Sequence, residues 1–260
     1  MSVSTSSESA IIVRLRIAGC VFAEEEAQLL VDAATTPEEL EIMVERRVGG
    51  TPLEQVLGWA QFCGLRIKLD PGVFVPRRRT EFLVEQAASL ARPCAVIVDL
   101  CCGSGAVGMA LIATVPGIEL FAADIDPAAV RCARRNLDPE RVFEGDLYQP
   151  LPVSLSGRIN ILVANAPYVP TDAIGMMPPE ARLHEAMVAL DGGADGVDIQ
   201  RRVAAEAAEW LAPGGHLLIE TSRRQAPATV EALVRGGLTT EVVTSDELSA
   251  TVVIGTMPSR

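Results

Sequence analysis

The residues best suited to chemistry are Asn165-Ala166-Pro167-Tyr168, which follow a short apolar segment over residues 159–164. The segment is rich in β-branched residues and bounded by glycine and proline, which predicts a buried strand. Pro167 ends the strand because it has no N–H to donate and holds Ala166 extended. The Asn165 side chain and the Ala166 carbonyl are then two acceptors beside an aromatic ring. This arrangement suits a planar NH2 group, although a simple strand-to-turn junction would look the same.

A second candidate site is the glycine-rich turn Asp99-Leu100-Cys101-Cys102-Gly103-Ser104-Gly105, between a predicted strand and a helix. Glycines let a backbone approach a ligand closely, and a helix N-terminus offers free N–H groups. With Gly108 the spacing is Gly-x-Gly-x-x-Gly, which is typical of dinucleotide sites but also of structural turns. Asp124 ends the next strand, where a carboxylate can accept both hydroxyls of a ribose. Together these residues indicate a cofactor that contains a nucleoside.

Two further aspartates bear on which cofactor it is. NAD needs a helix N-terminus for its pyrophosphate, whereas S-adenosylmethionine has no phosphate and carries an ammonium group. Asp99 is placed to face that cation, directly or through water. Asp146 ends the third strand, where it either binds the exocyclic amine of adenine or merely caps a turn. The residues favour S-adenosylmethionine and leave the role of Asp146 open.

The elements that position these residues alternate between strands and helices, which predicts a mostly parallel sheet covered on both faces. A helix is also expected from Thr80-Glu81 to Leu90. The other strands and helices are expected at residues 95–100, 118–123, 141–144, 159–164 and 215–220, and at 105–114, 127–137 and 198–211, with an antiparallel edge formed by 239–244 and 251–256. The fold class is therefore α/β, a Rossmann-like doubly wound sheet.

The first part of the chain has a different pattern. Residues 10–48 have helical periodicity, with Thr36 as an N-cap and Pro37 at the first helical position. Two short strands around Gly64 are expected to form a hairpin. We therefore expect an N-terminal helical domain over residues 1–50, a β-hairpin linker over 51–75 and a main domain over 76–260. The segment after Tyr168, with His184 and Glu185, is expected to be a surface loop.

Composition excludes several classes of protein. The net charge of −12 and the pI near 4.7 argue against affinity that comes from neutralising phosphates, so nucleic acid is not an expected partner. Six cysteines without Cys-x-x-Cys spacing and only two histidines predict neither a metal site nor a disulfide framework. The first ten residues are not expected to be a secretory signal, and no apolar segment reaches the ~20 residues that span a membrane. We expect a cytoplasmic protein without membrane contact; its oligomeric state is left open.

These residues together resemble class I methyltransferases. More narrowly, the chain is similar to the glutamine methyltransferases that modify the Gly-Gly-Gln loop of peptide-chain release factors. The resemblance extends from about residue 50 to 225. Besides the sites above, it rests on Gly50 to Gly58, Phe62 to Leu65, Val75-Pro76-Arg77 with Thr80-Glu81 (the family's Pro-Arg-Pro-Glu-Thr-Glu segment), Ala189 to Gly196, Leu211 to Gly215, and Glu220 with Gln225.

The resemblance implies a mechanism and a set of site residues. S-adenosylmethionine would be the methyl donor and S-adenosylhomocysteine the product. A glutamine in a protein, such as a release factor docked on the N-terminal helical domain, would be the acceptor. Asn165, Ala166, Pro167 and Tyr168 would form the catalytic site, aligning the amide nitrogen and favouring the charge that develops on it. The implied cofactor-binding residues are Asp99, Cys101, Cys102, Gly103, Ser104, Gly105, Asp124, Ile125, Asp146, Leu147 and Asn165.

Several positions depart from the family pattern. Ala166 replaces a proline, Arg78 and Arg79 replace Pro-Glu, and Thr221-Ser222 replaces a common His-Gly. These differences suggest a divergent paralogue, so the natural protein substrate, a release factor or another protein, is left open. Three alternatives stay open: a methyltransferase for an exocyclic amine of a nucleobase in DNA or RNA, an NAD-dependent oxidoreductase, and a non-catalytic paralogue that binds S-adenosylmethionine.

Overall fold

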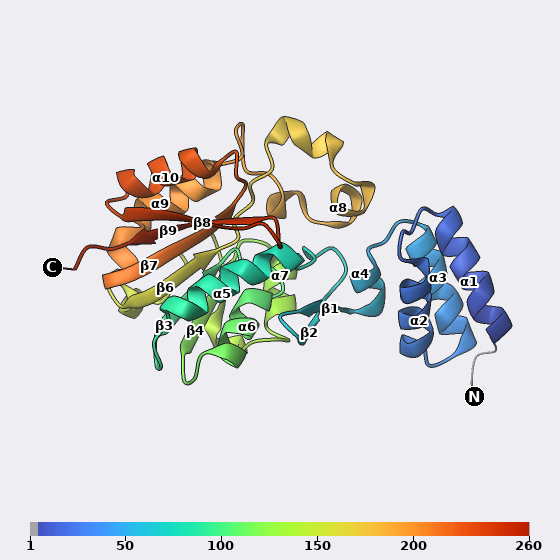
Figure 1. Cartoon of the computed structure of the whole chain (residues 1–260). Helices are drawn as coiled ribbons and strands as arrows, with labels where there is room; N and C mark the ends of the chain where they lie inside the picture. Colours follow the sequence, from blue (N-terminus) through green and yellow to red (C-terminus); the bar gives the residue numbers. More distant parts are fainter. Residues whose placement is uncertain (1–4, 260) are drawn as a thin grey trace.

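The computed structural model describes residues 5–259, and a seven-stranded sheet lies between helices on both of its faces (Figure 1). The strand order is β5-β4-β3-β6-β7-β9-β8. The strands are β3 (Val96–Leu100), β4 (Glu119–Asp124), β5 (Val142–Glu144), β6 (Ile159–Ala164), β7 (Leu211–Thr221), β8 (Thr239–Ser245) and β9 (Ala250–Thr256). The first five strands in this order are parallel, and β9 is antiparallel to β7 and β8. The predicted α/β class with an antiparallel edge is confirmed.

The central strands are apolar because both of their faces are covered. Ile97 and Ile161 face one core, with helices α5 (Glu81–Leu90), α6 (Ala106–Thr114) and α7 (Pro127–Ala133). Val98 and Leu162 face the other, with α9 (Asp198–Trp210) and α10 (Ala226–Arg235). From β3 the chain continues to β4 on one side and later to β6 on the other. The carboxyl ends of strands at such a reversal form the crevice in which α/β proteins bind ligands.

Three elements of the main domain between α6 and β8 differ from the prediction. Helix α7 ends at Ala133 instead of 137, because the Asn136 amide leaves the helix to donate to the carbonyls of Lys68 and Ser104, each at 2.8 Å. Strand β7 begins four residues early, since Gly215 lets it pass the Ile159 carbonyl, which a Cβ would approach to 2.7 Å. Helix α10 was not predicted; its early proline is as typical of a turn as of a helix start.

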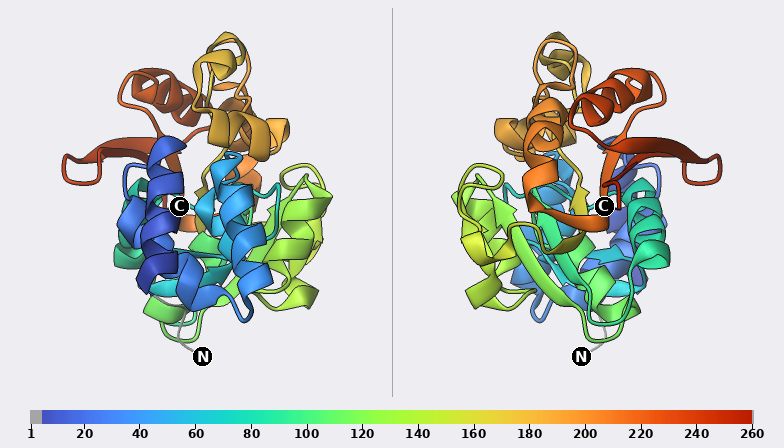
Figure 2. Two further views of the ribbon diagram at one scale, coloured as in Figure 1. Left: turned by 90° about the vertical axis from the view of Figure 1, so that its right-hand side faces the viewer. Right: turned by 90° about the vertical axis from the view of Figure 1, so that its left-hand side faces the viewer.

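The N-terminal helices form a unit with its own core (Figures 1 and 2). Helices α1 (Thr5–Ile17), α2 (Ala23–Ala33) and α3 (Pro37–Val48) bury side chains such as Leu15 and Leu30 completely. The Thr36 hydroxyl accepts a hydrogen bond from the Glu39 N–H at 3.1 Å, which confirms the predicted N-cap. Residues 1–4 of the expected helical domain lie outside the described residues.

A short helix and a hairpin connect this unit to the sheet (Figure 1). Helix α4 (Leu53–Leu57) was not predicted, whereas strands β1 (Trp59–Phe62) and β2 (Leu65–Lys68) pair as expected around Gly64. The turn residues Cys63 and Gly64 have φ of +48° and +76°, the positive values that a tight hairpin requires.

The segment between β6 and α9 is more than a surface loop. It contains the short helices η4 (Thr171–Met176), α8 (Pro179–His184) and η5 (Met187–Ala189). The expectation of a surface loop is wrong for Glu185, whose side chain is fully buried. This carboxylate accepts hydrogen bonds from the Val75 N–H at 3.1 Å and from Arg77 at 2.5 Å. A buried charge requires such partners, and they fix the segment against residues 72–77.

Candidate active site

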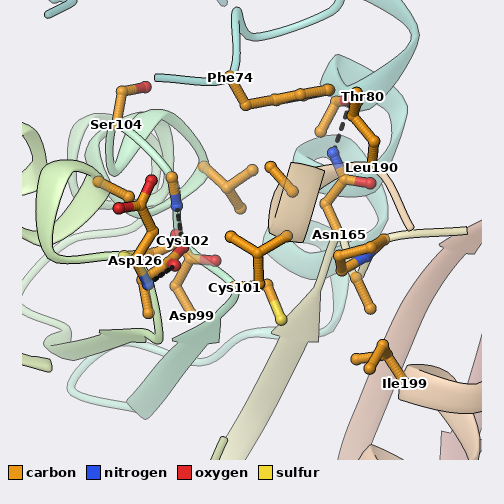
Figure 3. Close-up of a pocket in the computed structure, with 18 of the residues that line it drawn as sticks. Phe74, Thr80, Asp99, Cys101, Cys102, Ser104, Asp126, Asn165, Leu190 and Ile199 are labelled. Atoms are coloured by element: carbon orange, nitrogen blue, oxygen red, sulfur yellow. Dashed lines mark hydrogen bonds between the residues drawn. The ribbon is translucent and has the colours of Figure 1, made fainter. Parts of the chain in front are cut away.

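A pocket opens at the carboxyl ends of β3, β4 and β6 (Figure 3). Its lining includes nearly all residues that the sequence singled out: Asp99, Cys101, Cys102, Gly103, Ser104, Asp124, Ile125, Asp146, Leu147 and Asn165 to Tyr168. Gly105 lies outside the lining and has a packing role, since a Cβ on it would stand 2.8 Å from Leu137. The strand ends bring together two regions that are 60 residues apart in the chain.

Asp99 lies at the floor of the pocket, and only 2% of its surface is exposed. Its Oδ2 accepts one hydrogen bond, from the Gly108 N–H at 3.0 Å. Burial raises the pKa of Asp99 to about 7, and the charge of Asp124 adds to this effect. A buried carboxyl group with so little compensation is suited to a cationic ligand.

The turn after β3 has an unusual backbone. Gly103 has φ +56°, and a Cβ there would meet nothing within 4 Å, so the backbone faces open space. Cys101 has the same φ of +56°, a conformation that is uncommon in residues other than glycine. Burial raises the pKa of both the Cys101 and Cys102 thiols, and all six cysteines of the chain are free. The two cysteines thus contribute shape rather than a thiolate.

Asp124 holds the turn and faces the pocket at the same time. One of its oxygens accepts the Gly103 N–H at 2.8 Å and the other accepts the Asp126 N–H at 2.9 Å. A carboxylate has about four acceptor positions, so about two are left for a ligand. Burial raises the pKa of Asp124, with the backbone N–H groups of Asp126, Gly103 and Ile125 opposing the rise. This geometry is compatible with the predicted contact to a ribose.

Asp146 has a protein partner that the sequence did not reveal. Its Oδ2 lies 2.6 Å from Nη2 of Arg202 on α9, and Arg202 also lines the pocket. Leu147, beside it, has φ +50°, and Ile125 is half exposed at the end of β4. The ion pair neutralises Asp146, so its contact with adenine stays a prediction.

Asn165 lies at the end of β6 and points into the pocket (Figure 3). Its Nδ2 donates to the hydroxyl of Thr80 at 3.4 Å. Ala166 is 1% exposed, and its carbonyl stays a predicted acceptor. Behind the loop stands Gly192, where a Cβ would lie 2.7 Å from the Pro167 carbonyl. The close approach explains a glycine at this position.

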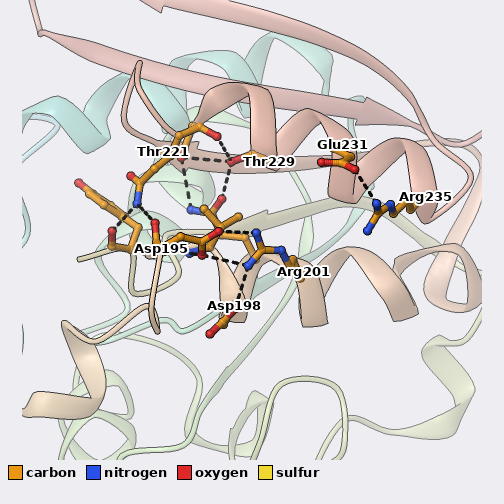
Figure 4. Close-up of polar contacts among 11 residues, drawn as sticks. Asp195, Asp198, Arg201, Thr221, Thr229, Glu231 and Arg235 are labelled. Carbon is orange, nitrogen blue, oxygen red and sulfur yellow. Dashed lines mark hydrogen bonds and ion pairs between the residues drawn. The ribbon is translucent and has the colours of Figure 1, made fainter. Parts of the chain in front are cut away.

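Gln225 holds the loop from the other side. Its Nε2 donates to the Tyr168 carbonyl at 2.8 Å and to the Asp195 carbonyl at 3.0 Å. The Ser222 hydroxyl donates to its Oε1 at 2.5 Å, which fixes the orientation of the amide. Asp195 is in turn bound by both Nη atoms of Arg201, at 2.9 and 2.5 Å (Figure 4). One of the departures from the family pattern, Ser222, therefore supports the site.

Tyr168 interacts with a buried carboxyl group. Its hydroxyl donates to Glu220 Oε1 at 3.2 Å, and Arg79 Nε donates to the same oxygen at 3.3 Å. The Arg79 guanidinium also lies over the Tyr168 ring, 5.6 Å from its centroid. Burial raises the pKa of the Tyr168 phenol. Tyr168 is thus a neutral aromatic surface held in place by its hydroxyl.

Several pocket residues were missed as site residues. Phe74, Arg79, Thr80, Ile199 and Arg202 line the pocket but come from two other segments, residues 74–80 and helix α9. The family resemblance at residues 75–81 was the one available signal for Thr80. Among residues 5–259 no group of three side chains could hold a metal ion, and no helix is long and apolar enough to cross a membrane.

Comparison with known proteins gives consistent matches. The family model of the methyltransferase small domain matches residues 64–195. A release factor glutamine methyltransferase of Geobacter sulfurreducens is 36% identical over 213 residues, which cover 79% of this chain and 74% of the relative. A 4-amino-L-phenylalanine/4-methylamino-L-phenylalanine methyltransferase of Streptomyces pristinaespiralis is 36% identical over 212 residues, 78% and 72% of the two chains.

Solved structures support the fold. A methyltransferase from Pyrococcus furiosus superposes with a TM-score of 0.56 at 15% identity, over 82% of this chain and 97% of that one. The sequence relatives decide the family, because several of them exceed one third identity over more than two thirds of both chains. The protein belongs to the release factor glutamine methyltransferase family.

Proposed function

We propose that this protein transfers a methyl group from S-adenosylmethionine to the side-chain amide nitrogen of a glutamine in a protein, and that this substrate is a peptide-chain release factor. One observation carries the proposal. In a chain of this family, Asn165 at the end of β6 faces the same pocket as the buried Asp99 and the partly exposed Asp124. The pocket thus combines a place for a cationic nucleoside with acceptors for an NH2 group.

The residues present fit S-adenosylmethionine better than NAD. Asp99 is buried with one backbone donor and would gain a counter-charge from the ammonium group of the methionine part. The free acceptor positions of Asp124 suit the ribose hydroxyls. The carboxyl groups of Asp99 and Asp124 would repel the pyrophosphate of NAD.

The chain's own residues would align the acceptor rather than activate it. S-adenosylmethionine supplies a methyl group that is already activated by its sulfonium. Asn165 Oδ1 and the Ala166 carbonyl would hold the two hydrogens of the glutamine nitrogen, and Tyr168 would pack against the amide plane. The nitrogen forms its bond to carbon as the sulfur–carbon bond breaks, and then loses one proton to water. The acceptors favour this reaction because they stabilise the positive charge that develops on nitrogen.

We extend the proposal to the parts of the chain. Residues 1–50 would be the substrate-docking domain, 51–75 the linker and 76–260 the catalytic domain. Arg47 on α3 is buried and binds both Glu26 at 2.5 Å and Glu180 on α8 at 2.6 Å. This contact supports the assignment, since it connects the helical unit to the segment that follows Tyr168. The activity would take place in the cytoplasm, where release factors act.

A small aromatic amine is the second candidate acceptor. One relative is named as a 4-amino-L-phenylalanine methyltransferase and is as similar as the release factor enzymes. An amino-acid substrate has a carboxylate, and Arg79 at the pocket has guanidinium nitrogens beyond the one that binds Glu220.

Mass spectrometry distinguishes the candidates. The purified protein is incubated with S-adenosylmethionine and either the release factor of its own organism, that factor with the acceptor glutamine changed to glutamate, or 4-amino-L-phenylalanine. We expect one added methyl group on the Gly-Gly-Gln glutamine and none on the control factor. Methylation of the aromatic amine alone would replace the proposed substrate. No methylation of any acceptor, with S-adenosylhomocysteine still bound, would point to a non-catalytic paralogue.

A further inference from the structure

The orientation of one amide group decides whether the acceptor site can work. An asparagine side chain presents either an oxygen that accepts or an NH2 group that donates. The proposed function, on which this inference rests, needs the oxygen of Asn165 toward the glutamine nitrogen. A half-turn of the amide would present two hydrogens to the hydrogens of the acceptor. Something in the protein must therefore distinguish the two orientations.

Thr80 contacts the amide but does not decide its orientation alone. It is 2% exposed, and its hydroxyl oxygen accepts from Asn165 Nδ2 at 3.4 Å (Figure 3). A hydroxyl group can also donate. If the Thr80 proton pointed to Asn165, the reversed amide would be equally well bonded. The direction depends on where the Thr80 proton goes.

Glu220 is the group that can take this proton. It is 1% exposed, and its Oε1 accepts from both Tyr168 and Arg79. Its Oε2 is buried and has no hydrogen-bond partner among residues 5–259, which is a rare and costly state for a carboxylate oxygen. Thr80 is placed beside this carboxyl group by its chain neighbour Arg79, which donates to Glu220 Oε1. The Thr80 hydroxyl also opposes, with Arg79 and Tyr168, the rise in the pKa of Glu220 that burial causes.

We propose that Thr80 and Glu220 are positioning residues that keep the Asn165 oxygen directed at the acceptor. An ionised carboxylate only accepts hydrogen bonds. The Thr80 hydroxyl directs its proton toward Glu220 Oε2, the oxygen that has no other partner among residues 5–259, and leaves its own oxygen to accept from the Asn165 NH2 group. Asn165 then donates to Thr80, and Thr80 donates to Glu220. Tyr168 donates to the same carboxylate, so one buried charge sets both the amide and the aromatic ring.

Arg79, which contacts this arrangement, is a position at which the chain departs from the family segment. The family segment has a glutamate at this position, and here a guanidinium donates to Glu220. The positive charge favours the ionised form of the carboxyl group, and only that form fixes the direction of the Thr80 hydroxyl.

Nuclear magnetic resonance tests the arrangement without a substrate. The chain has three asparagines, Asn136, Asn160 and Asn165, so labelling asparagine alone gives three side-chain NH2 signals. The variant Asn165→Asp assigns its signal by loss. Asn136 serves as an internal control, because its NH2 group donates to the carbonyls of Lys68 and Ser104.

The informative variants are Thr80→Val, which has nearly the same shape without a hydroxyl, and Thr80→Ser, which keeps the hydroxyl. We expect Thr80→Val and Glu220→Gln to shift the Asn165 signal and speed its solvent exchange at least about tenfold. Thr80→Ser should retain the wild-type signal, and Asn136 should not change in any variant. An Asn165 signal that is the same in Thr80→Val and wild type would overturn the proposal.

Kinetics provide the second measurement. With whichever acceptor the protein methylates, kcat should fall about 10- to 100-fold in Thr80→Val and Glu220→Gln, with S-adenosylhomocysteine affinity within about twofold of wild type. Thr80→Ser should recover most of the loss. Equal loss in Thr80→Ser and Thr80→Val would mean that the packing of the Thr80 side chain, rather than its hydroxyl, determines the rate, and would contradict the proposal. If wild type methylates no glutamine, the proposed function fails, while the resonance result still decides the orientation.

Discussion

The two halves of the pocket are built in different ways. The cofactor half comprises Asp99, the turn 101–105, Asp124 and Asp146, and the acceptor half comprises residues 165–168 with Thr80 and Glu220. In the cofactor half, the backbone N–H groups of Gly103, Gly108 and Asp126 bind the carboxylates of Asp99 and Asp124, whereas Asp146 pairs with the Arg202 side chain. In the acceptor half, side chains from distant segments hold Asn165 and Tyr168.

The difference has a physical consequence. Backbone groups are retained whatever the side chains are, so the cofactor half tolerates substitution around its carboxylates. The acceptor half depends on side chains that each have one or two partners, so single changes there should alter the chemistry. The same contrast predicts that variants of the acceptor half lose rate while keeping cofactor affinity.

The largest expected effect is that of Asn165→Ala on the rate. Removing a side-chain acceptor that acts in the transition state should lower kcat about 100- to 1000-fold. The measurement is steady-state methyl transfer to the acceptor that wild type modifies. A kcat within about threefold of wild type would contradict the assignment of Asn165 as a catalytic residue.

A matched pair of glycine variants tests how tightly the acceptor half is packed. Gly196 and Gly64 have φ of +77° and +76°, but a Cβ on Gly196 would lie 2.4 Å from the Tyr168 carbonyl, whereas one on Gly64 meets nothing within 4 Å. Gly64→Ala should lower the free energy of unfolding by about 1 kcal/mol through backbone strain alone.

Gly196→Ala should lower the free energy of unfolding by at least about 1 kcal/mol more, since the loop must move. It should also reduce kcat, which Gly64→Ala leaves unchanged. Denaturant unfolding and kinetics of the two variants check this. Equal losses of stability and activity would show that the contact with Tyr168 has no role.

The smallest expected effect is the release of a proton from Asp99 when a ligand binds. Because the pKa of Asp99 is raised to about 7, the cofactor-free protein holds a proton there at pH 6, and an ammonium ligand should expel it. Calorimetry in buffers of different ionisation enthalpy should detect release of about 0.9 proton at pH 6 and about 0.1 at pH 8 when S-adenosylhomocysteine binds. In Asp99→Asn, the difference in proton release between pH 6 and pH 8 should disappear.

The same raised pKa affects stability in a defined direction. Between about pH 4 and pH 7 the folded protein keeps the Asp99 proton that the unfolded chain has lost, so the free energy of unfolding should fall as the pH rises through this range. If Asp99→Asn had the same pH dependence as wild type, another group would be responsible.

The cofactor half could be predicted from the sequence more fully than the acceptor half, because its contacts are formed by residues with local signals in the chain. The strands and the turn 101–105 have local signals, namely apolar segments and glycine spacing. Asp124 stands at a fixed distance along the chain from that turn. These signals sufficed for the sheet and its antiparallel edge, and nearly all of the site residues that the sequence singled out line the pocket.

Contacts over long distances in the chain had no such signal. Thr80, Tyr168 and Glu220 come from three segments, and nothing in their neighbours indicates that they meet. Likewise, Arg202 gave no hint of its ion pair with Asp146, and Glu185 looked like a loop residue although Arg77 and Val75 bury it. Cys101 and Leu147 have positive φ, which sequence reasoning assigns to glycine.

The most direct test of the separation between the halves is calorimetry with S-adenosylhomocysteine and NAD on wild type, Asn165→Ala and Asp124→Ala. Wild type and Asn165→Ala should bind S-adenosylhomocysteine with affinities within about threefold of each other, and Asp124→Ala should lose about 10- to 100-fold. NAD should not bind. Tight NAD binding, or an equal loss of S-adenosylhomocysteine affinity in both variants, would contradict the account.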